Sequence, residues 1–237
     1  HTGCSELCSL YLHPAHRRHQ AGALLSKCRF LFIASQRHLF AEKAIAELRG
    51  FINSDGVSPF WEGLGRHFFD MDFSDADYLS AVSNKQFIAE LMPRYPFYTN
   101  LLPQAARDVI GREHNDARPA RIMLEQEGFH YEGYVDIFDA GPTVESYTGQ
   151  IRAVRDSQHA SQQQVQQQRA HPLLLANESR NDFRCLLLSA DPSPWHCHTV
   201  DAAWQTLQLA DTQPARMVRL YGHVLDGRAA EDKGRTT

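Results

Sequence analysis

The apolar positions near the start of the chain change their spacing at a proline. Leu7 and Leu12 bound a short apolar run that breaks at Pro14, and a run of this kind is typical of a strand inside a sheet. Over residues 22–40 the apolar side chains instead recur at helical spacing. The pattern therefore predicts a strand over 5–12, a basic turn, and then a long helix.

The rest of the chain alternates between helical and strand patterns. Small polar residues or proline precede several predicted helices, and glycine follows them, as expected at helix ends. Helices are predicted over 58–64, 74–79, 85–92, 103–110, 118–127 and 200–209. Strands are predicted over 43–49, 66–73, 129–138, 173–176, 183–189 and 216–221, with a turn at Gly141-Pro142. Intrinsic propensity alone would also allow a helix over 43–49.

The composition changes at Ser157. The stretch from there to Arg169 is rich in glutamine and contains few apolar residues, so it has little apolar area to offset the entropy lost on ordering. We expect a linker or mobile loop over 156–171. This divides the chain into a core over 1–155 and a small β-rich lobe over 172–237.

The overall composition is that of an ordinary globular protein. Of the 237 residues, 43% are hydrophobic and 22% are charged, and the net charge is −4. This charge argues against nucleic acid or an anionic membrane as the main partner, and no apolar run approaches the length of a membrane span. The N-terminus has no signal-peptide pattern. The five cysteines include no CxxC pair, which fits a reducing, cytoplasmic location.

The basic turn before the long helix has the chemistry of a phosphate site. Arg17 and Arg18 precede Gly22 at the predicted helix start. The first backbone N–H groups of a helix have no internal partner, and the helix dipole adds positive charge there. Arg17, Arg18 and the N–H groups from Gln20 to Gly22 are therefore candidate ligands of a phosphate. A solvated basic turn is the alternative.

Arg17-x-x-Gln20-x-Gly22 resembles the turn with which the GNAT superfamily of N-acyltransferases binds the pyrophosphate of coenzyme A. Longer blocks look more narrowly like the bacterial arginine N-succinyltransferase family. The family has glycine where this chain has Gln20, and a side chain there could crowd the phosphates. The similar blocks are residues 1–8, 24–30, 58–61, 71–77, 87–93 and 108–111.

The resemblance implies an α/β fold, with a GNAT-like acyl-CoA N-acyltransferase core and a small C-terminal β-rich lobe. The chain begins at His1, within the sequence that the family shares. We therefore expect a truncated product that lacks the N-terminal strands of the core, with an unpaired edge on the strand over 5–12. A partner or a further segment that supplies those strands is the alternative.

The same resemblance assigns roles to individual residues. His114 stands where the family has its proton donor, and the residue after it is Asn115 where the family has proline. Leu10 stands where the family binds succinyl-CoA, which a strand backbone could do by pairing with pantetheine. The resemblance thus implies catalysis by His114 and cofactor binding by Leu10, Arg17, Arg18 and Gly22. The alternatives are an exposed loop histidine and a core leucine.

The implied reaction transfers succinyl from succinyl-CoA to the α-amine of L-arginine in arginine catabolism, with no metal. Histidine suits the acid role because its pKa lies near neutrality. The alternatives are the same chemistry on ornithine or a related amine, and a non-catalytic remnant that associates with a full-length subunit. The oligomeric state is left open. Carboxylates could bind the guanidinium of arginine, although helix capping also explains some of them: Asp70, Asp72, Asp75, Asp77, Glu6, Glu47 and Glu90.

The run His196-Cys197-His198 raises the question of a metal site. Structural zinc sites usually have four ligands at recognisable spacing, and no second pair of ligands lies nearby in the sequence. Neighbouring residues of a strand also point to opposite faces. We therefore do not predict a metal site here.

Overall fold

The structure is a computed structural model that describes residues 2–82, 95–96, 98–191, 193 and 196–222. It divides into two compact units. The first comprises His1–Cys8 and Ala41–Tyr147, and the second comprises Ser9–Phe40 and Thr148–Thr237. The predicted helix over 85–92 lies outside the described residues. In the described part of the chain, no helix is both long and apolar enough to cross a membrane.

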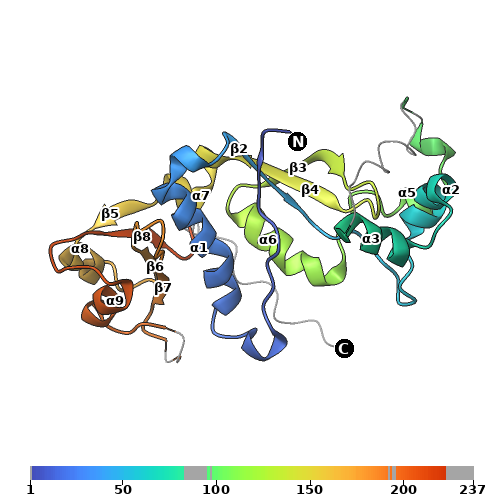
Figure 1. The fold of residues 1–237 in the computed structure, drawn as a ribbon. Coiled ribbons are helices and arrows are strands. Elements are labelled where there is room, and N and C mark those ends of the chain that lie inside the picture. Colours follow the sequence, from blue (N-terminus) through green and yellow to red (C-terminus); the bar gives the residue numbers. More distant parts are fainter. Residues whose placement is uncertain (1, 83–94, 97, 192, 194–195, 223–237) are drawn as a thin grey trace, which may run out of the picture. The chain divides into compact units, whose positions relative to one another are not determined.

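The first unit is built on a four-stranded sheet of order β1-β2-β4-β3 (Figure 1). Strand β1 pairs parallel with β2, whereas β2 with β4 and β3 with β4 are antiparallel pairs. The pairing of β1 with β2 confirms the strand predicted at 43–49, which alternates buried alanines with larger side chains. The strands are β1 (Ser5–Glu6), β2 (Lys43–Glu47), β3 (His130–Val135) and β4 (Pro142–Tyr147).

Short helices make up the rest of the first unit. Trp61 is fully buried and stacks on Phe69 and Phe138 at 5.3 and 5.6 Å between ring centroids. A second apolar cluster surrounds Phe60 and Val109. The helical segments are the π-helical turn η3 (Trp61–Gly65), α2 (Arg66–Phe69), α3 (Phe73–Val82), η4 (Thr99–Leu101), α5 (Gln104–Arg107), η5 (Asn115–Ala117) and α6 (Arg118–Gln126).

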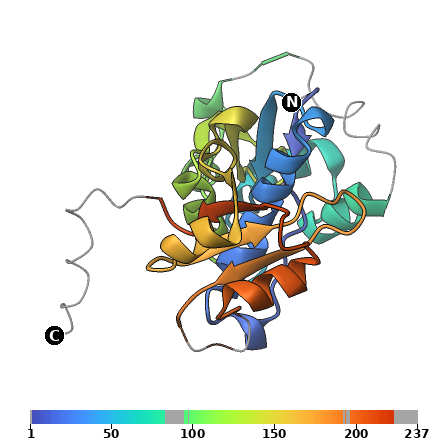
Figure 2. The same cartoon turned by 90° about the vertical axis from the view of Figure 1, so that its left-hand side faces the viewer.

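The second unit is built on an antiparallel sheet of order β5-β8-β6-β7. Helices α8 and α9 pack on one face around Trp204, and Figure 2 shows α9 (orange-red) beside these strands. Helix α1 contacts β6 and β7. The segments are η1 (Pro14–His16), α1 (Ala21–Ser35), η2 (Arg37–Leu39), η6 (Thr148–Gln150), α7 (Arg152–Arg155), β5 (Gln158–Ala160), α8 (Gln162–Gln167), β6 (Leu173–Ala176), β7 (Cys185–Leu188), α9 (Val200–Leu207) and β8 (Ala215–Arg219).

Several predicted elements differ from the structure. The helix predicted over 22–40 ends at Ser35 and is followed by the short 3-10 helix η2. The strand expected over 5–12 ends at Glu6, because Leu7 donates the last hydrogen bond to β2 among the described residues and Ser9 has a positive φ of 57°. The strand expected over 66–73 was wrong: this stretch continues the helix through Gly65 so that Phe69 reaches Trp61. Gly141-Pro142 is not the turn, since Pro142 opens β4.

The glutamine-rich stretch is folded, in contrast to the linker expected over 156–171. Ser161 and Gln164 form a reciprocal capping box at the start of α8, and Val165 is fully buried in the core of the second unit. Strand β5 also pairs with β8 through this stretch. One buried valine and one cap therefore order a segment whose composition alone indicates disorder. The unit that contains the predicted C-terminal lobe also contains α1.

Candidate functional site

The start of α1 has main-chain donors that find no acceptor in the part of the chain that the structure describes. Its N-cap, Gln20, has left-handed backbone angles (φ 59°, ψ 13°) and makes no side-chain capping bond. Ala21 donates to the oxygen of Arg18 and Leu24 to that of Gln20. Among the described residues, the N–H groups of Gly22 and Ala23 have no acceptor. No acidic side chain lies in this first turn, so the end of the helix has the donors and the dipole that favour an anion.

The two arginines of the turn differ in what they contact. Both are exposed. Arg17 donates from Nε to the main-chain oxygen of Leu12 at 3.1 Å, which ties this side chain to the preceding segment. Arg18 has no side-chain partner among the described residues, so its guanidinium is free to meet an anion.

The side chain of Gln20 is directed into the protein. Its Oε1 is buried and has no hydrogen-bond partner in the described residues. His19, beside it, also has a positive φ, of 51°. Two consecutive non-glycine residues in the left-handed region are strained, so other contacts must hold this turn.

His196 provides one such contact, which the sequence did not indicate. Its Nε2 donates to the main-chain oxygen of His19 at 2.8 Å, and the residue is only 8% exposed. Nδ1 is buried without a partner in the described part of the chain. His198 instead contacts the main-chain oxygens of Ser189 and Ser193. These two histidines therefore meet main-chain oxygens, and the described residues hold no group of three or more His, Cys, Asp or Glu placed for a metal.

Leu10 lies in a segment that has left the sheet. Strand β1 pairs with β2 only at Ser5 and Glu6, and Leu7 donates to the oxygen of Ile45 at 2.8 Å. The side chain of Leu10 is 36% exposed, so it is not the core leucine of the alternative reading. No main-chain partner of Leu10 exists among the described residues, which leaves its amide and carbonyl open to a ligand.

His114 lies in the first unit, beside the end of β2. Its N–H donates to the oxygen of Arg49 at 2.7 Å, and Glu113 bridges Gly50. The imidazole is 22% exposed, and its Nδ1 accepts from the N–H of Asp116 at 3.2 Å. A ring whose Nδ1 accepts carries its proton on Nε2. No partner of Nε2 is found in the described residues, so this nitrogen is open to a substrate.

Asp139 supports this segment, and the sequence analysis missed it. Its carboxylate accepts from the N–H of Gly50 at 2.7 Å and from that of Gly141 at 2.8 Å. Burial raises the pKa of Asp139, and these two donors act against that rise. A Cβ on Gly50 would lie 2.2 Å from the oxygen of Asp139, so this brace requires glycine. The Asp-Ala-Gly order is a turn signal that could have pointed to it.

An ion pair fixes the residue before His114. Arg121 Nη1 lies 2.6 Å from Glu113 Oε2, with side-chain exposures of 23% and 17%. Burial alone would raise the pKa of Glu113, but hydrogen bonds from its own backbone N–H and from Arg121 lower it below the ordinary value. The pair joins the start of α6 to the loop that carries His114.

The acidic residues considered for the acceptor divide into separate environments. Asp72 pairs with Arg66 at 2.9 Å. Asp70 ends α2 with a positive φ of 47°, and Asp75 is exposed in the first turn of α3. Glu6 and Glu47 are exposed on β1 and β2. Glu90 and the side chain of Asp77 lie outside the described part of the structure.

Comparisons with known proteins agree on one family. A model of the arginine N-succinyltransferase beta subunit matches residues 1–153. The beta subunit of arginine N-succinyltransferase from Pseudomonas aeruginosa is 56% identical over 184 residues, which are 77% of this chain and 54% of that protein. Arginine N-succinyltransferase from Escherichia fergusonii is 46% identical over 222 residues, 93% of this chain and 64% of that protein.

The fold has a solved relative as well. The structure of arginine/ornithine succinyltransferase subunit AI from Pseudomonas aeruginosa aligns with a TM-score of 0.75 at 30% identity, covering 92% of this chain and 63% of that one. The mixed α/β fold is therefore GNAT-like, as expected. The chain spans between 54% and 64% of the lengths of these relatives. It belongs to the arginine N-succinyltransferase beta subunit family.

Proposed function

We propose that this chain carries the acyl-donor site and the proton donor of an arginine N-succinyltransferase, which moves succinyl from succinyl-CoA to the α-amine of L-arginine. The observation that carries the proposal is the start of α1, where the N–H groups of Gly22 and Ala23 and the nearby exposed side chain of Arg18 in the sequence all lack a partner among the described residues. Donors and positive charge at a helix N-terminus favour a pyrophosphate. Arg17, held by its hydrogen bond to the main-chain oxygen of Leu12, adds a second positive charge to this turn.

The acyl arm of the coenzyme would follow the segment after β1. Amide and thioester groups of pantetheine can pair with an open backbone as another strand would, and the main chain of Leu10, which has no partner among the described residues, offers such a site. The exposed leucine side chain would cover the apolar part of the arm. This is the role proposed for Leu10.

His114 would complete the reaction. The free amine attacks the thioester carbonyl, a C–N bond forms, and the C–S bond breaks as the tetrahedral intermediate collapses. The amine loses one proton to solvent, and the leaving thiolate takes one from Nε2 of the protonated imidazole of His114, which becomes neutral. The open Nε2 of His114, with Nδ1 turned to the N–H of Asp116, supports this assignment. None of these steps calls for a metal or a covalent enzyme intermediate.

Ornithine is a second candidate acceptor, because the structural relative is described as an arginine/ornithine succinyltransferase subunit. The words "subunit" in that description and "beta subunit" in the family's name also support assembly with another subunit. A non-catalytic chain that only joins such an assembly remains the rival. The cytoplasmic location remains a prediction from the cysteine pattern.

Calorimetry with succinyl-CoA tests the proposal. We expect saturable heat from the full chain and a dissociation constant about tenfold higher for Arg18→Ala, because a charge-assisted hydrogen bond is lost. Arg184→Ala, which removes an arginine paired with Asp182 elsewhere in the second unit, should bind as the wild type does. Absence of saturable heat from the wild type, or equal affinity in Arg18→Ala, would contradict the coenzyme site.

The acceptor is tested separately. Formation of the succinylated product is followed with L-arginine and L-ornithine, for the chain alone and for the chain mixed with a full-length member of the family. Turnover by the chain alone, faster on arginine, is expected. If product forms only in the mixture and is unaffected by His114→Asn in this chain, the non-catalytic reading is correct.

A further inference from the structure

The charged side chains are distributed unequally between the two units. With histidine counted as neutral, the first unit carries 19 acidic and 9 basic side chains, a net charge of −10. The second unit carries 9 acidic and 15 basic side chains, a net charge of +6, and the two values add to the −4 of the whole chain. An excess of one sign raises the local concentration of ligands of the opposite sign. The first unit therefore favours a cationic ligand, and the second favours the anionic coenzyme.

Three carboxylates of this acidic unit border the loop that carries His114, and two of them are already engaged. Glu113 pairs with Arg121 at 2.6 Å. Asp139 accepts hydrogen bonds from two main-chain N–H groups, at 2.7 and 2.8 Å. A carboxylate whose oxygens already meet fixed donors has less to offer a ligand. The third carboxylate is that of Asp116, two residues after His114.

The carboxylate of Asp116 is open to a ligand. Its side chain is 87% exposed, and its Oδ2 lies 3.8 Å from Nδ1 of His114. The main-chain N–H of Asp116 donates to the same nitrogen at 3.2 Å, so the backbone, and not the carboxylate, orients the ring. His114 is the one cationic partner of this carboxylate among the described residues. An ionised carboxylate has about four lone-pair sites, so it can meet a protonated imidazole and a ligand cation together.

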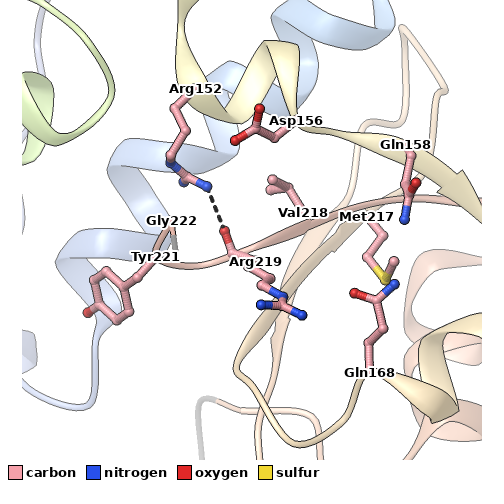
Figure 3. Close-up of a pocket in the computed structure, with 9 residues that line it drawn as sticks. All are labelled: Arg152, Asp156, Gln158, Gln168, Met217, Val218, Arg219, Tyr221 and Gly222. Atoms are coloured by element: carbon pink, nitrogen blue, oxygen red, sulfur yellow. Dashed lines mark hydrogen bonds between the residues drawn. The ribbon is translucent and has the colours of Figure 1, made fainter. Parts of the chain in front are cut away.

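The cavity at the end of β8 in the second unit does not offer a comparable carboxylate. Figure 3 shows the nine residues that line it, of which only Asp156 is acidic. One oxygen of Asp156 accepts from Nε of Arg155 at 2.8 Å, and the other accepts from Nη2 of the same residue at 3.3 Å. Both oxygens therefore already meet a guanidinium. A cationic ligand gains less at Asp156 than at Asp116.

We propose that Asp116 determines the specificity for the acceptor by binding its cationic side chain. This inference rests on the proposed function, because it places the acceptor beside His114, where the leaving thiolate takes its proton. The α-amine then faces the thioester while the side-chain cation faces Asp116. A guanidinium pairs with both oxygens of a carboxylate, whereas an ammonium group meets it as a point charge. Asp116 thereby selects amino acids with a positive side chain over neutral ones of the same size.

The test is calorimetry of the full chain saturated with coenzyme A, which carries no succinyl group and therefore allows binding without reaction. L-Arginine is compared with L-citrulline, in which a neutral urea group of the same shape replaces the guanidinium. We expect the wild type to bind arginine about tenfold more tightly than citrulline or better, because only arginine makes a charge-assisted hydrogen bond. Equal affinity for the two amino acids would overturn the proposal.

Variants assign this preference to Asp116. Asp116→Asn keeps the shape of the side chain and the main-chain N–H that meets His114, so it should weaken arginine binding about tenfold and leave citrulline and coenzyme A unchanged. Asp116→Glu keeps the charge and should retain part of the preference. Asp55→Asn, which removes an exposed carboxylate elsewhere in the same unit, is the control and should bind arginine as the wild type does. Unchanged arginine affinity in Asp116→Asn, or an equal loss for arginine and citrulline, would contradict the assignment.

The outcomes separate this inference from the proposed function. If coenzyme A gives no saturable heat, the proposed function and this inference are both wrong. If coenzyme A binds and arginine is not preferred over citrulline, this inference alone is wrong. Circular dichroism of each variant checks that it is folded. If Asp116→Asn does not fold, Asp116→Ser, which also removes the carboxylate, takes its place in the comparison with Asp116→Glu.

Discussion

The imidazole Nε2 of His196 lies 2.8 Å from the main-chain oxygen of His19. This bond joins a residue far along the chain to the turn that precedes α1, where His19 and Gln20 both have positive φ. Strained backbone persists only when surrounding contacts hold it. His196 is therefore a positioning residue for the proposed pyrophosphate site.

Replacing His196 by alanine should raise the KM for succinyl-CoA several-fold and leave the KM for the amine unchanged. The turn before α1 loses the hydrogen bond from His196, whereas the contacts to the amine substrate do not change. Steady-state kinetics measure both constants. His196→Gln, which can still donate from Nε2, should recover part of the loss. His171→Ala, which removes an exposed histidine of the same unit, is the control, and an equal effect there would contradict the role of His196.

His114→Asn separates the two roles of that side chain. Asparagine can accept from the N–H of Asp116 as Nδ1 does, so the loop should keep its shape while the proton donor is lost. We expect kcat to fall by about 10²- to 10⁴-fold, the usual contribution of general acid catalysis, with unchanged affinity for succinyl-CoA. Measured kcat within a factor of two of the wild type would exclude His114 as the proton donor.

Gly141→Ala should destabilise the brace beneath His114. The new Cβ would lie 2.0 Å from the oxygen of Leu48 and 2.6 Å from the nitrogen of Gly50, and these are main-chain atoms that cannot move aside cheaply. We expect a loss of about 2 kcal/mol or more in the free energy of unfolding. Urea unfolding measures it. Gly149→Ala, where the new Cβ meets nothing within 4 Å, is the matched control and should change stability little.

The Glu113–Arg121 ion pair should make the stability of the protein depend on pH. Because the folded-state pKa of Glu113 is lowered, its contribution is present above the unfolded-state pKa, about 4.3, and is lost as the pH falls through the folded-state value. Glu113→Gln should therefore be less stable than the wild type at pH 7, by about 1 kcal/mol.

That difference should shrink as the pH falls below the unfolded-state pKa and disappear once the pH is below the lowered folded-state pKa, where Glu113 is protonated in both states. Thermal or urea unfolding across this range measures it. A stability difference that stays constant with pH would show that the pair does not act through its charge.

Local patterns were sufficient where short-range spacing decides the structure. The apolar run of residues 173–176 became the predicted strand β6, in which all four residues are buried. The helical period of residues 22–40 became α1, although α1 ends at Ser35 and buries Ser26 and Lys27 beside its apolar side chains. The basic turn and the helix start that follows it were visible for the same reason, since Arg17, Arg18 and Gly22 are neighbours in the sequence. The family blocks in the first part of the chain pointed to the correct family.

Long-range contacts decided the rest. Phe69 joins a helix because Trp61 offers it a stacking partner, and Val165 orders a glutamine-rich stretch because α8 can bury it beneath the second sheet. His196 holds the main-chain oxygen of His19 from a distant position, and Asp139 holds the N–H groups of Gly50 and Gly141 near the segment that carries His114. Such bonds leave no periodicity in the sequence, because a main-chain acceptor or donor is offered by almost any residue, and only the folded chain shows which one is used.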